Sequence, residues 1–172
     1  VLSISAISVE YHSGTITSDQ TWYAVDNPHI ITGNIAIADG ATVSIEPGSY
    51  VEFSGLYTFT VYGSLIANGT DVEHITITSG QTSPASGDWQ YIHFYYADGV
   101  NLLDYCDISY GGYSYANVYV TGASDVTIGN CTIGNSATNG IAADGGANPN
   151  VWYCSIFSNA LYGVYTYDAG TN

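Results

Sequence analysis

Apolar and polar residues alternate along most of the chain in runs of three to five positions, which is the periodicity of a β-strand. Such runs occupy residues 35–37, 43–45, 51–53, 59–61, 65–66 and 75–77, and turn-forming Gly, Asn and Asp residues separate them. Helical spacing is not sustained anywhere in the sequence. The pattern predicts an all-β protein that is built from many short strands.

The short strands form a repeat that three cysteines mark. Cys106, Cys131 and Cys154 follow one another at nearly equal intervals, and an Ile follows each of them two positions later. Because alternate residues of a strand face the same side, the Cys and Ile residues are predicted to point inward, with Asn130 and Thr132 outward. A free Cys behaves as a small apolar side chain. The cysteines are therefore predicted to form an inner ladder, and a redox or disulfide role is the alternative.

Other apolar positions repeat at the same intervals. Val118, Ile141 and Val164 follow one another at the interval that separates Cys131 from Cys154. Residues 126–128 align with residues 151–153 at the interval that separates Cys106 from Cys131. One coil of this size cannot bury its apolar face alone, so such units are typical of a solenoid in which coils stack on one another. We expect a parallel β-helix with coils of about 20–25 residues.

The repeat predicts one β-helix domain over residues 12–172, with a protruding loop near residues 79–88. Residues 1–11 are predicted to form a separate strand that acts as a cap or is exchanged with a neighbouring copy. The sequence begins at Val1 and stops after one strand of a coil. We therefore expect either a fragment of a longer protein or an end that another copy covers. The candidate assembly residues are Leu2, Ile4, Ile7, Val9, Val164, Tyr165 and Tyr167.

Particular segments resemble a known family. Residues 45–53, 63–70 and 75–79, followed by Gly-Asp-Trp at residues 87–89, are similar to the N-terminal half of secreted right-handed parallel β-helix repeat proteins. The repeated Asn-Cys-Thr-Ile and Asn-Gly-Ile frames of the C-terminal half resemble the pectate-lyase-like repeat of the same superfamily. The resemblance implies a right-handed parallel β-helix and an extracellular or cell-surface location. It does not imply one activity, since that superfamily includes enzymes, adhesins and surface proteins.

Composition narrows the range of functions. The 172 residues include 15 Asp and Glu but no Lys or Arg, which gives a net charge of −15. A phosphate clamp cannot form without these cations, so nucleic acid is excluded as a partner, and no apolar run is long enough to span a membrane. Lyases and polygalacturonases of the resembled superfamily use Arg or Lys in catalysis. We therefore expect a non-catalytic member and transfer no catalytic residue, with an enzyme as the alternative.

Carboxylates and tyrosines supply the remaining candidate chemistry. Asp104 and Asp107, with His93 one coil away, are a candidate acid pair, with solvated turn residues as the alternative. We expect that the protein requires no cofactor. If it binds a metal ion, the acidic residues favour calcium. The candidate calcium ligands are Asp39, Glu46, Glu52, Asp104, Asp107, Asp125 and Asp144.

Four of the 17 tyrosines lie close together in the sequence. They are candidates for stacking on carbohydrate or on a partner protein, and they are Tyr110, Tyr113, Tyr115 and Tyr119. Asn68 begins an Asn-Gly-Thr acceptor for N-glycosylation in a predicted turn, and Asn130 begins a second acceptor in a predicted strand.

The sequence favours an extracellular structural or adhesive β-helix module whose copies associate end to end into a filament or surface layer. Its expected partners are copies of itself or the rest of a longer chain, and polysaccharide. The alternative function is a β-helix that binds or cleaves carbohydrate, as a polysaccharide lyase or hydrolase does.

Overall fold

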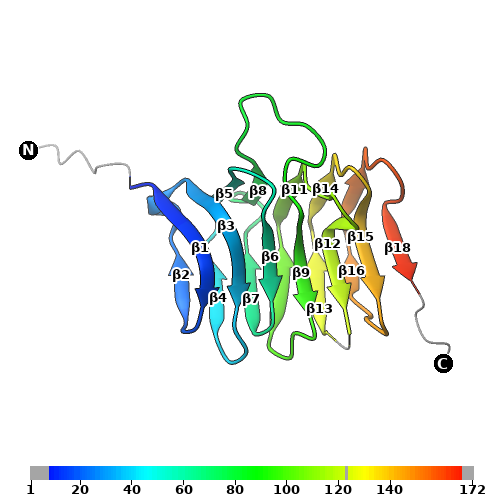
Figure 1. Cartoon of the computed structure of the whole chain (residues 1–172), viewed down its shortest axis with the longest axis horizontal. Coiled ribbons are helices and arrows are strands. Elements are labelled where there is room, and N and C mark those ends of the chain that lie inside the picture. The colour runs from blue at the N-terminus through cyan, green and yellow to red at the C-terminus, as the bar shows by residue number, and fades with distance from the viewer. Residues whose placement is uncertain (1–7, 123, 168–172) are drawn as a thin grey trace, which may run out of the picture.

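The computed structural model describes residues 8–122 and 124–167, and it consists almost entirely of short strands. Figure 1 shows these strands stacked side by side along the long axis, with the first and last described strands at opposite ends of the stack. The elements in chain order are β1 (Glu10–Ile16), β2 (Gln20–Trp22), the 3-10 helix η1 (Ala24–Asp26), β3 (His29–Ile37), β4 (Thr42–Ile45), β5 (Tyr50–Phe53), β6 (Thr58–Val61), β7 (Ser64–Asn68), β8 (Ile75–Ser79), β9 (Tyr91–Tyr95), β10 (Asn101–Asp104), β11 (Cys106–Ser109), β12 (Ala116–Thr121), β13 (Val126–Gly129), β14 (Thr132–Gly134), β15 (Asn139–Asp144), β16 (Asn150–Trp152), β17 (Ser155–Phe157) and β18 (Val164–Tyr167).

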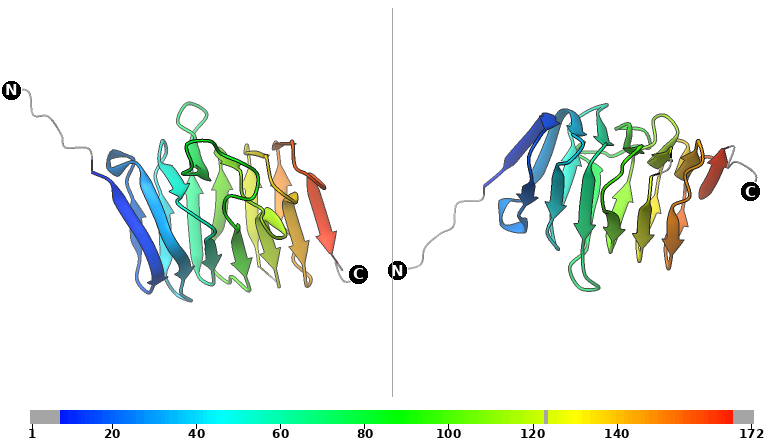
Figure 2. Two further views of the ribbon diagram at one scale, coloured as in Figure 1. Left: turned by 45° about the horizontal axis from the view of Figure 1, so that its top comes forward. Right: turned by 90° about the horizontal axis from the view of Figure 1, so that it is seen from below.

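The strands form a parallel solenoid of about seven turns, which confirms the predicted fold class. The long strand β3 pairs with β5 through its first residues and with β6 through its last ones. The 12-stranded sheet therefore has two faces, one with the order β3-β5-β8-β11-β14-β17 and the other with the order β3-β6-β9-β12-β15-β18. The six-stranded sheet β2-β4-β7-β10-β13-β16 forms the third face. The two further views in Figure 2 show the same stack of coils.

The pairing of strands confirms most of the predicted repeat. Val118 pairs with Ile141, which pairs with Val164, so these positions lie above one another on successive coils. The predicted alignment of residues 126–128 with residues 151–153 is wrong, because Ile128 pairs with Val151 and not with Tyr153. Ile128 and Val151 are separated by the same interval as Cys131 and Cys154. This interval also separates Asn130 from Tyr153, which form the equivalent turns of the two coils.

The core consists of side chains that point inward from all three faces. Cys106 and Cys131 are fully buried and Cys154 is partly buried, and all three are free thiols, as the predicted ladder requires. Each thiol donates to a backbone carbonyl of the preceding coil, for example Sγ of Cys131 to O of Leu103 at 3.4 Å. The contact with Cys131 and burial of the Cys106 thiol raise the pKa of Cys106. The ladder is therefore a packing feature of the described coils.

The segment between β8 and β9 leaves the stack and returns through a buried tryptophan. Trp89 stacks on Phe53 with ring centroids 4.3 Å apart, and its Nε1 donates to O of Ser109 at 2.9 Å. Oγ of Ser79 donates to the Asp88 carboxylate at 2.6 Å. The projecting loop is visible at the top of Figure 1, and Trp89 holds its base against both β5 and β11.

The turns that precede β11, β14 and β17 share one backbone conformation. Tyr105, Asn130 and Tyr153 have φ of 48°, 49° and 51° at equivalent positions of successive coils. This left-handed region suits Asn better than most residues. Asn130 therefore lies in a turn rather than in the strand that the sequence pattern predicted, and its Nδ2 donates to Oδ1 of Asp104 at 2.8 Å.

Candidate functional site: a tyrosine-walled groove

The candidate site lies on the outer surface of the face that contains β9, β12, β15 and β18. Strand pairing places His93, Tyr119, Ala142 and Tyr165 in one row across this face. The small Ala142 side chain lies between two tyrosines that are two strand spacings apart, or about 9.6 Å. A depression forms because one coil contributes a methyl group where its neighbours contribute phenol rings.

This depression is a groove of about 300 Å³. Its lining comes from three neighbouring strands and the turn before β12, and consists of Tyr115, Tyr119, Asn139, Ala142, Ala143, Asp144, Tyr165 and Tyr167. We refer to it as the tyrosine groove. Strand pairing also places Asp144 beside Tyr167, so the floor ends at a carboxylate.

The aromatic walls are held by contacts between rings. Tyr115 and Tyr119 stack with centroids 4.6 Å apart and an interplanar angle of 6°. His93 stacks on Tyr119 from the preceding coil at 4.7 Å. On the opposite wall Tyr162 stacks on Tyr165 at 5.2 Å. Rings that stack on one another lose little side-chain freedom when a ligand arrives, so the groove is largely formed in advance.

Hydrogen bonds fix the polar end of the groove. The Tyr119 hydroxyl donates to Oδ2 of Asp144 at 3.3 Å, and the backbone N–H of Gly145 donates to Oδ1 at 2.5 Å. Burial and the neighbouring Asp144 carboxylate raise the pKa of Tyr119 to about 12. The phenol therefore remains protonated and continues to donate to Asp144 at neutral pH.

A second, more open depression of about 390 Å³ continues the groove over β9. Tyr91, His93 and Tyr95 line it together with Tyr119 and Asp144, which both depressions share. Nε2 of His93 lies 2.9 Å from Oγ1 of Thr121, and burial lowers the pKa of His93 to about 4. The aromatic surface thus extends over the four neighbouring strands β9, β12, β15 and β18.

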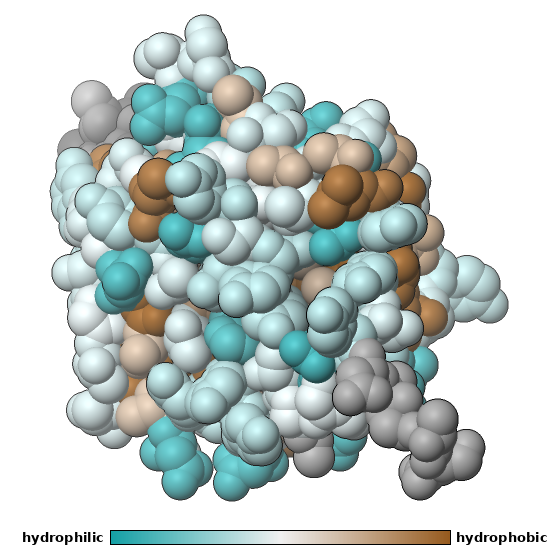
Figure 3. Space-filling view, turned by 45° about the vertical axis from the view of Figure 1, so that its right-hand side comes forward, coloured by the Kyte–Doolittle hydropathy of each residue, from teal (hydrophilic) through white to brown (hydrophobic). Residues whose placement is uncertain are grey.

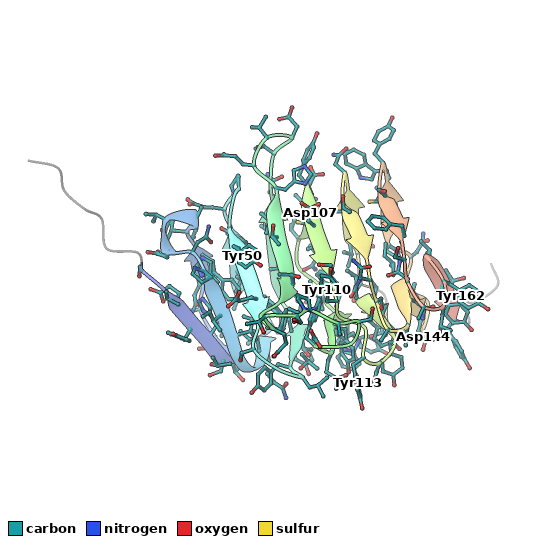
Figure 4. All side chains as sticks on the ribbon, turned by 90° about the horizontal axis from the view of Figure 1, so that it is seen from above. Tyr50, Asp107, Tyr110, Tyr113, Asp144 and Tyr162 are labelled. Atoms are coloured by element: carbon teal, nitrogen blue, oxygen red, sulfur yellow. The ribbon has the colours of Figure 1, made fainter. Side chains whose placement is uncertain are left out.

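The structure divides the predicted stacking residues into two groups. Tyr115 and Tyr119 are in the groove, whereas Tyr110 and Tyr113 belong to the segment between β11 and β12 near the long loop. Figure 4 labels Tyr113 at the outside of the molecule. The cluster of four tyrosines that the sequence indicated is therefore not one surface.

The predicted assembly residues are also divided. Tyr165 and Tyr167 line the groove, Val164 is exposed on the last described strand, and Val9 is exposed just before β1. The remaining three, Leu2, Ile4 and Ile7, lie outside the described residues.

The carboxylates that the sequence singled out are dispersed. Asp104 ends β10 on the third face and Asp107 is in β11 on another, because the turn at Tyr105 separates them, so they do not form an acid pair. The described partner of Asp107 is His74, whose Nδ1 lies 3.2 Å from Oδ2. In the described part of the chain, no three His, Cys, Asp or Glu side chains form a group that could hold a metal ion. Asn68 is exposed at the end of β7.

Ala142, Tyr91 and Tyr95 were missed in the sequence, although a signal for the first was present. Ala142 lies midway between Tyr119 and Tyr165, at the same interval that relates Val118, Ile141 and Val164. Reading the outward positions of the repeat as well as the inward ones would have placed Ala142 between two tyrosines.

Coils of parallel strands stacked on three faces define a β-helix. Residues 5–172 match the family described as "Right handed beta helix region", and the chain belongs to this family. The comparison with curated proteins and the comparison with solved structures each found no match. Within the described residues, no helix is long and apolar enough to cross a membrane.

Proposed function

We propose that this chain is a non-catalytic carbohydrate-binding β-helix module that works outside the cell. The observation that carries the proposal is the tyrosine groove, in which Tyr119 and Tyr165 lie on either side of Ala142. Aromatic rings bind the apolar faces of sugars, and the carboxylate of Asp144 can accept hydrogen bonds from sugar hydroxyls. The groove also has the size and shape of small-ligand sites, which are concave and mostly apolar with a few polar groups.

The groove holds one carboxylate, and this favours binding over cleavage. Acid hydrolysis of a glycosidic bond uses two carboxyl groups on either side of the bond. Asp144 is the one acidic residue in the lining, and its two oxygens are engaged by Tyr119 and Gly145. The chain also has no Lys or Arg that could act as a base in a lyase reaction.

Affinity electrophoresis through gels that contain neutral, acidic or amine-bearing polysaccharides, with and without calcium, tests this proposal. We expect at least one polysaccharide to retard the wild-type chain. Ala142→Phe fills the floor of the groove without changing charge, so this variant should migrate as it does in a gel without polysaccharide. Thr60→Phe is the matched control. Thr60 is in β6 and pairs with His93 of β9, so it lies in the same outward row but outside the groove. Equal migration of the folded wild-type chain in every gel would overturn the proposal.

End-to-end association is a second candidate function, and the last described coil favours it. Phe157, Leu161 and Val164 are each about half exposed or more, at 48%, 63% and 48%. Figure 3, which brings this end of the molecule forward, shows apolar side chains as separate brown patches among polar ones. A further coil stacked on β17 and β18 would cover them. Sedimentation of the wild-type chain and of Val164→Asp tests this function: larger species that the substitution removes support it, and monomers at all concentrations contradict it.

A further inference from the structure

The carboxylate at the end of the tyrosine groove has no cationic partner among the described residues. Its two hydrogen-bond donors, the Tyr119 hydroxyl and the Gly145 amide, are both neutral groups. His93 is the basic side chain that stacks on this wall, and its pKa of about 4 keeps it uncharged at neutral and mildly acidic pH. The sequence contains no Lys or Arg that could neutralise Asp144. No described side chain therefore offsets the charge of this carboxylate.

The walls add to the attraction for a cation. Aromatic rings carry negative charge on their faces and attract ammonium groups that lie within about 6 Å of the ring centre. Tyr115, Tyr119, Tyr165 and Tyr167 all line the same groove, next to the Asp144 carboxylate. A ligand cation that approaches this carboxylate also passes close to phenol rings.

The charge of the whole chain acts in the same direction. A net charge of −15 on 172 residues repels polyanions and raises the local concentration of cations at the surface. Polysaccharides rich in uronic acids therefore meet an unfavourable electrostatic field in this groove. Neutral sugars gain stacking and hydrogen bonds from their hydroxyls, whereas amino sugars also gain the attraction between an ammonium group and the carboxylate.

We propose that the tyrosine groove selects a polysaccharide of protonated hexosamine units, with a sugar ring between the aromatic walls and its ammonium group at Asp144. This inference rests on the proposed carbohydrate-binding function and adds the class of ligand. The ammonium group donates to the Asp144 carboxylate, whose oxygens can each accept a second hydrogen bond beside those from Tyr119 and Gly145. Tyr119 holds the carboxylate in place through its hydroxyl.

Calorimetric titration of the wild-type chain with a glucosamine oligomer and with its N-acetylated counterpart tests the inference. The two ligands have the same length and linkage and differ in the amine, which is charged at about pH 5.5. We expect the free amine form to bind at least about tenfold more tightly, which corresponds to about 1.4 kcal/mol. Added salt should reduce this preference, because exposed charges are screened over roughly 10 Å at 0.1 M ionic strength.

Asp144→Asn keeps the shape of the groove and removes the charge, so it should bring the two affinities to within about twofold. Asp125→Asn is the control, since it removes the same charge from an exposed residue outside the groove. Equal binding of both oligomers to the wild-type chain would overturn the inference and leave the carbohydrate-binding function standing. A preference that Asp144→Asn does not reduce would also overturn it. Failure of both oligomers and of every polysaccharide gel would overturn the proposed function itself.

Discussion

The hydroxyl of Tyr119 and the carboxylate of Asp144 are joined by a hydrogen bond of 3.3 Å between neighbouring coils. The two residues are close to one repeat apart in the sequence and lie in adjacent outward rows of the same face. The solenoid thus brings an aromatic wall and a charged end of the groove together through the pairing of β12 with β15.

This hydrogen bond predicts a loss of stability at alkaline pH. Burial and Asp144 raise the pKa of Tyr119 from 10 to about 12, so the folded state favours the protonated phenol. The stabilisation is complete below about pH 10 and is lost as the pH rises towards 12. The free energy of unfolding, from urea titrations, should fall less steeply over this range in Tyr119→Phe than in the wild-type chain. Identical slopes in the two proteins would contradict the assignment.

Acid should destabilise the first coil and the β9 surface. Burial, and in the case of His12 also the nearby His29, lowers the pKa values of His12 and His93 from 6.5 to about 4. The folded state therefore favours neutral imidazoles, and the stabilisation present above about pH 6.5 is lost as the pH falls to 4.

The histidine contribution can be isolated with His93→Gln. The side chains of His12 and His93 are both partly exposed. Solvent screening therefore reduces the free energy that each contributes to folding to about 1 kcal/mol. The unfolding free energy of His93→Gln should depend less on pH between 6.5 and 4 than that of the wild-type chain. An unchanged dependence would show that His93 is not the group that titrates.

The inward and outward positions of one strand should differ sharply in their tolerance to substitution. Ile133 is fully buried in β14, and its neighbour Thr132 is partly exposed on the outer surface. Ile133→Ala should lower the unfolding free energy by about 2–4 kcal/mol, because it leaves a cavity between stacked coils. Thr132→Ala should change it by less than about 0.5 kcal/mol. Comparable losses in chemical denaturation would contradict the stacked-coil geometry.

The packing at the base of the long loop requires a glycine at position 111. A Cβ at Gly111 would lie 2.5 Å from the buried ring of Trp89 and 2.8 Å from Oδ1 of Asn117. Gly111→Ala should therefore displace Trp89 and cost about 1–3 kcal/mol. At Gly163 the nearest atom to such a Cβ is a methyl carbon of Ile156 at 3.4 Å, an ordinary contact, so Gly163→Ala should have little effect. Thermal unfolding and Trp fluorescence measure both variants, and an unshifted Trp spectrum in Gly111→Ala would oppose this account.

The fold could be predicted because inward positions repeat. Val118, Ile141 and Val164 recur at one constant interval, and a buried row tolerates only a narrow range of side chains, so packing leaves a visible pattern. The predicted alignment of residues 126–128 with residues 151–153 was wrong, because the apolar character of residues 151–153 does not fix which of them pairs with Ile128. Only the shared turn at Asn130 and Tyr153 decides this pairing.

The groove was harder to predict because its outward row follows no packing rule. Tyr119, Ala142 and Tyr165 differ in size, and that difference makes the depression. Tyr110 and Tyr113 are near Tyr115 in sequence, but the turn that begins at Tyr110, with φ of 65°, directs the chain towards the long loop. Proximity in sequence was therefore a poor guide to a shared surface, whereas the repeat interval was a good one.

The central claim is that a sugar ring enters the groove between Tyr119 and Tyr165. Titration of the folded chain with a glucosamine oligomer, followed by NMR of the assigned tyrosine ring protons, tests this most directly. The account predicts that the ring signals of Tyr119 and Tyr165 shift together and saturate with one affinity, while those of Tyr113 stay in place. Saturable shifts at Tyr113 with none at Tyr119 and Tyr165, or no shift at any tyrosine, would contradict it.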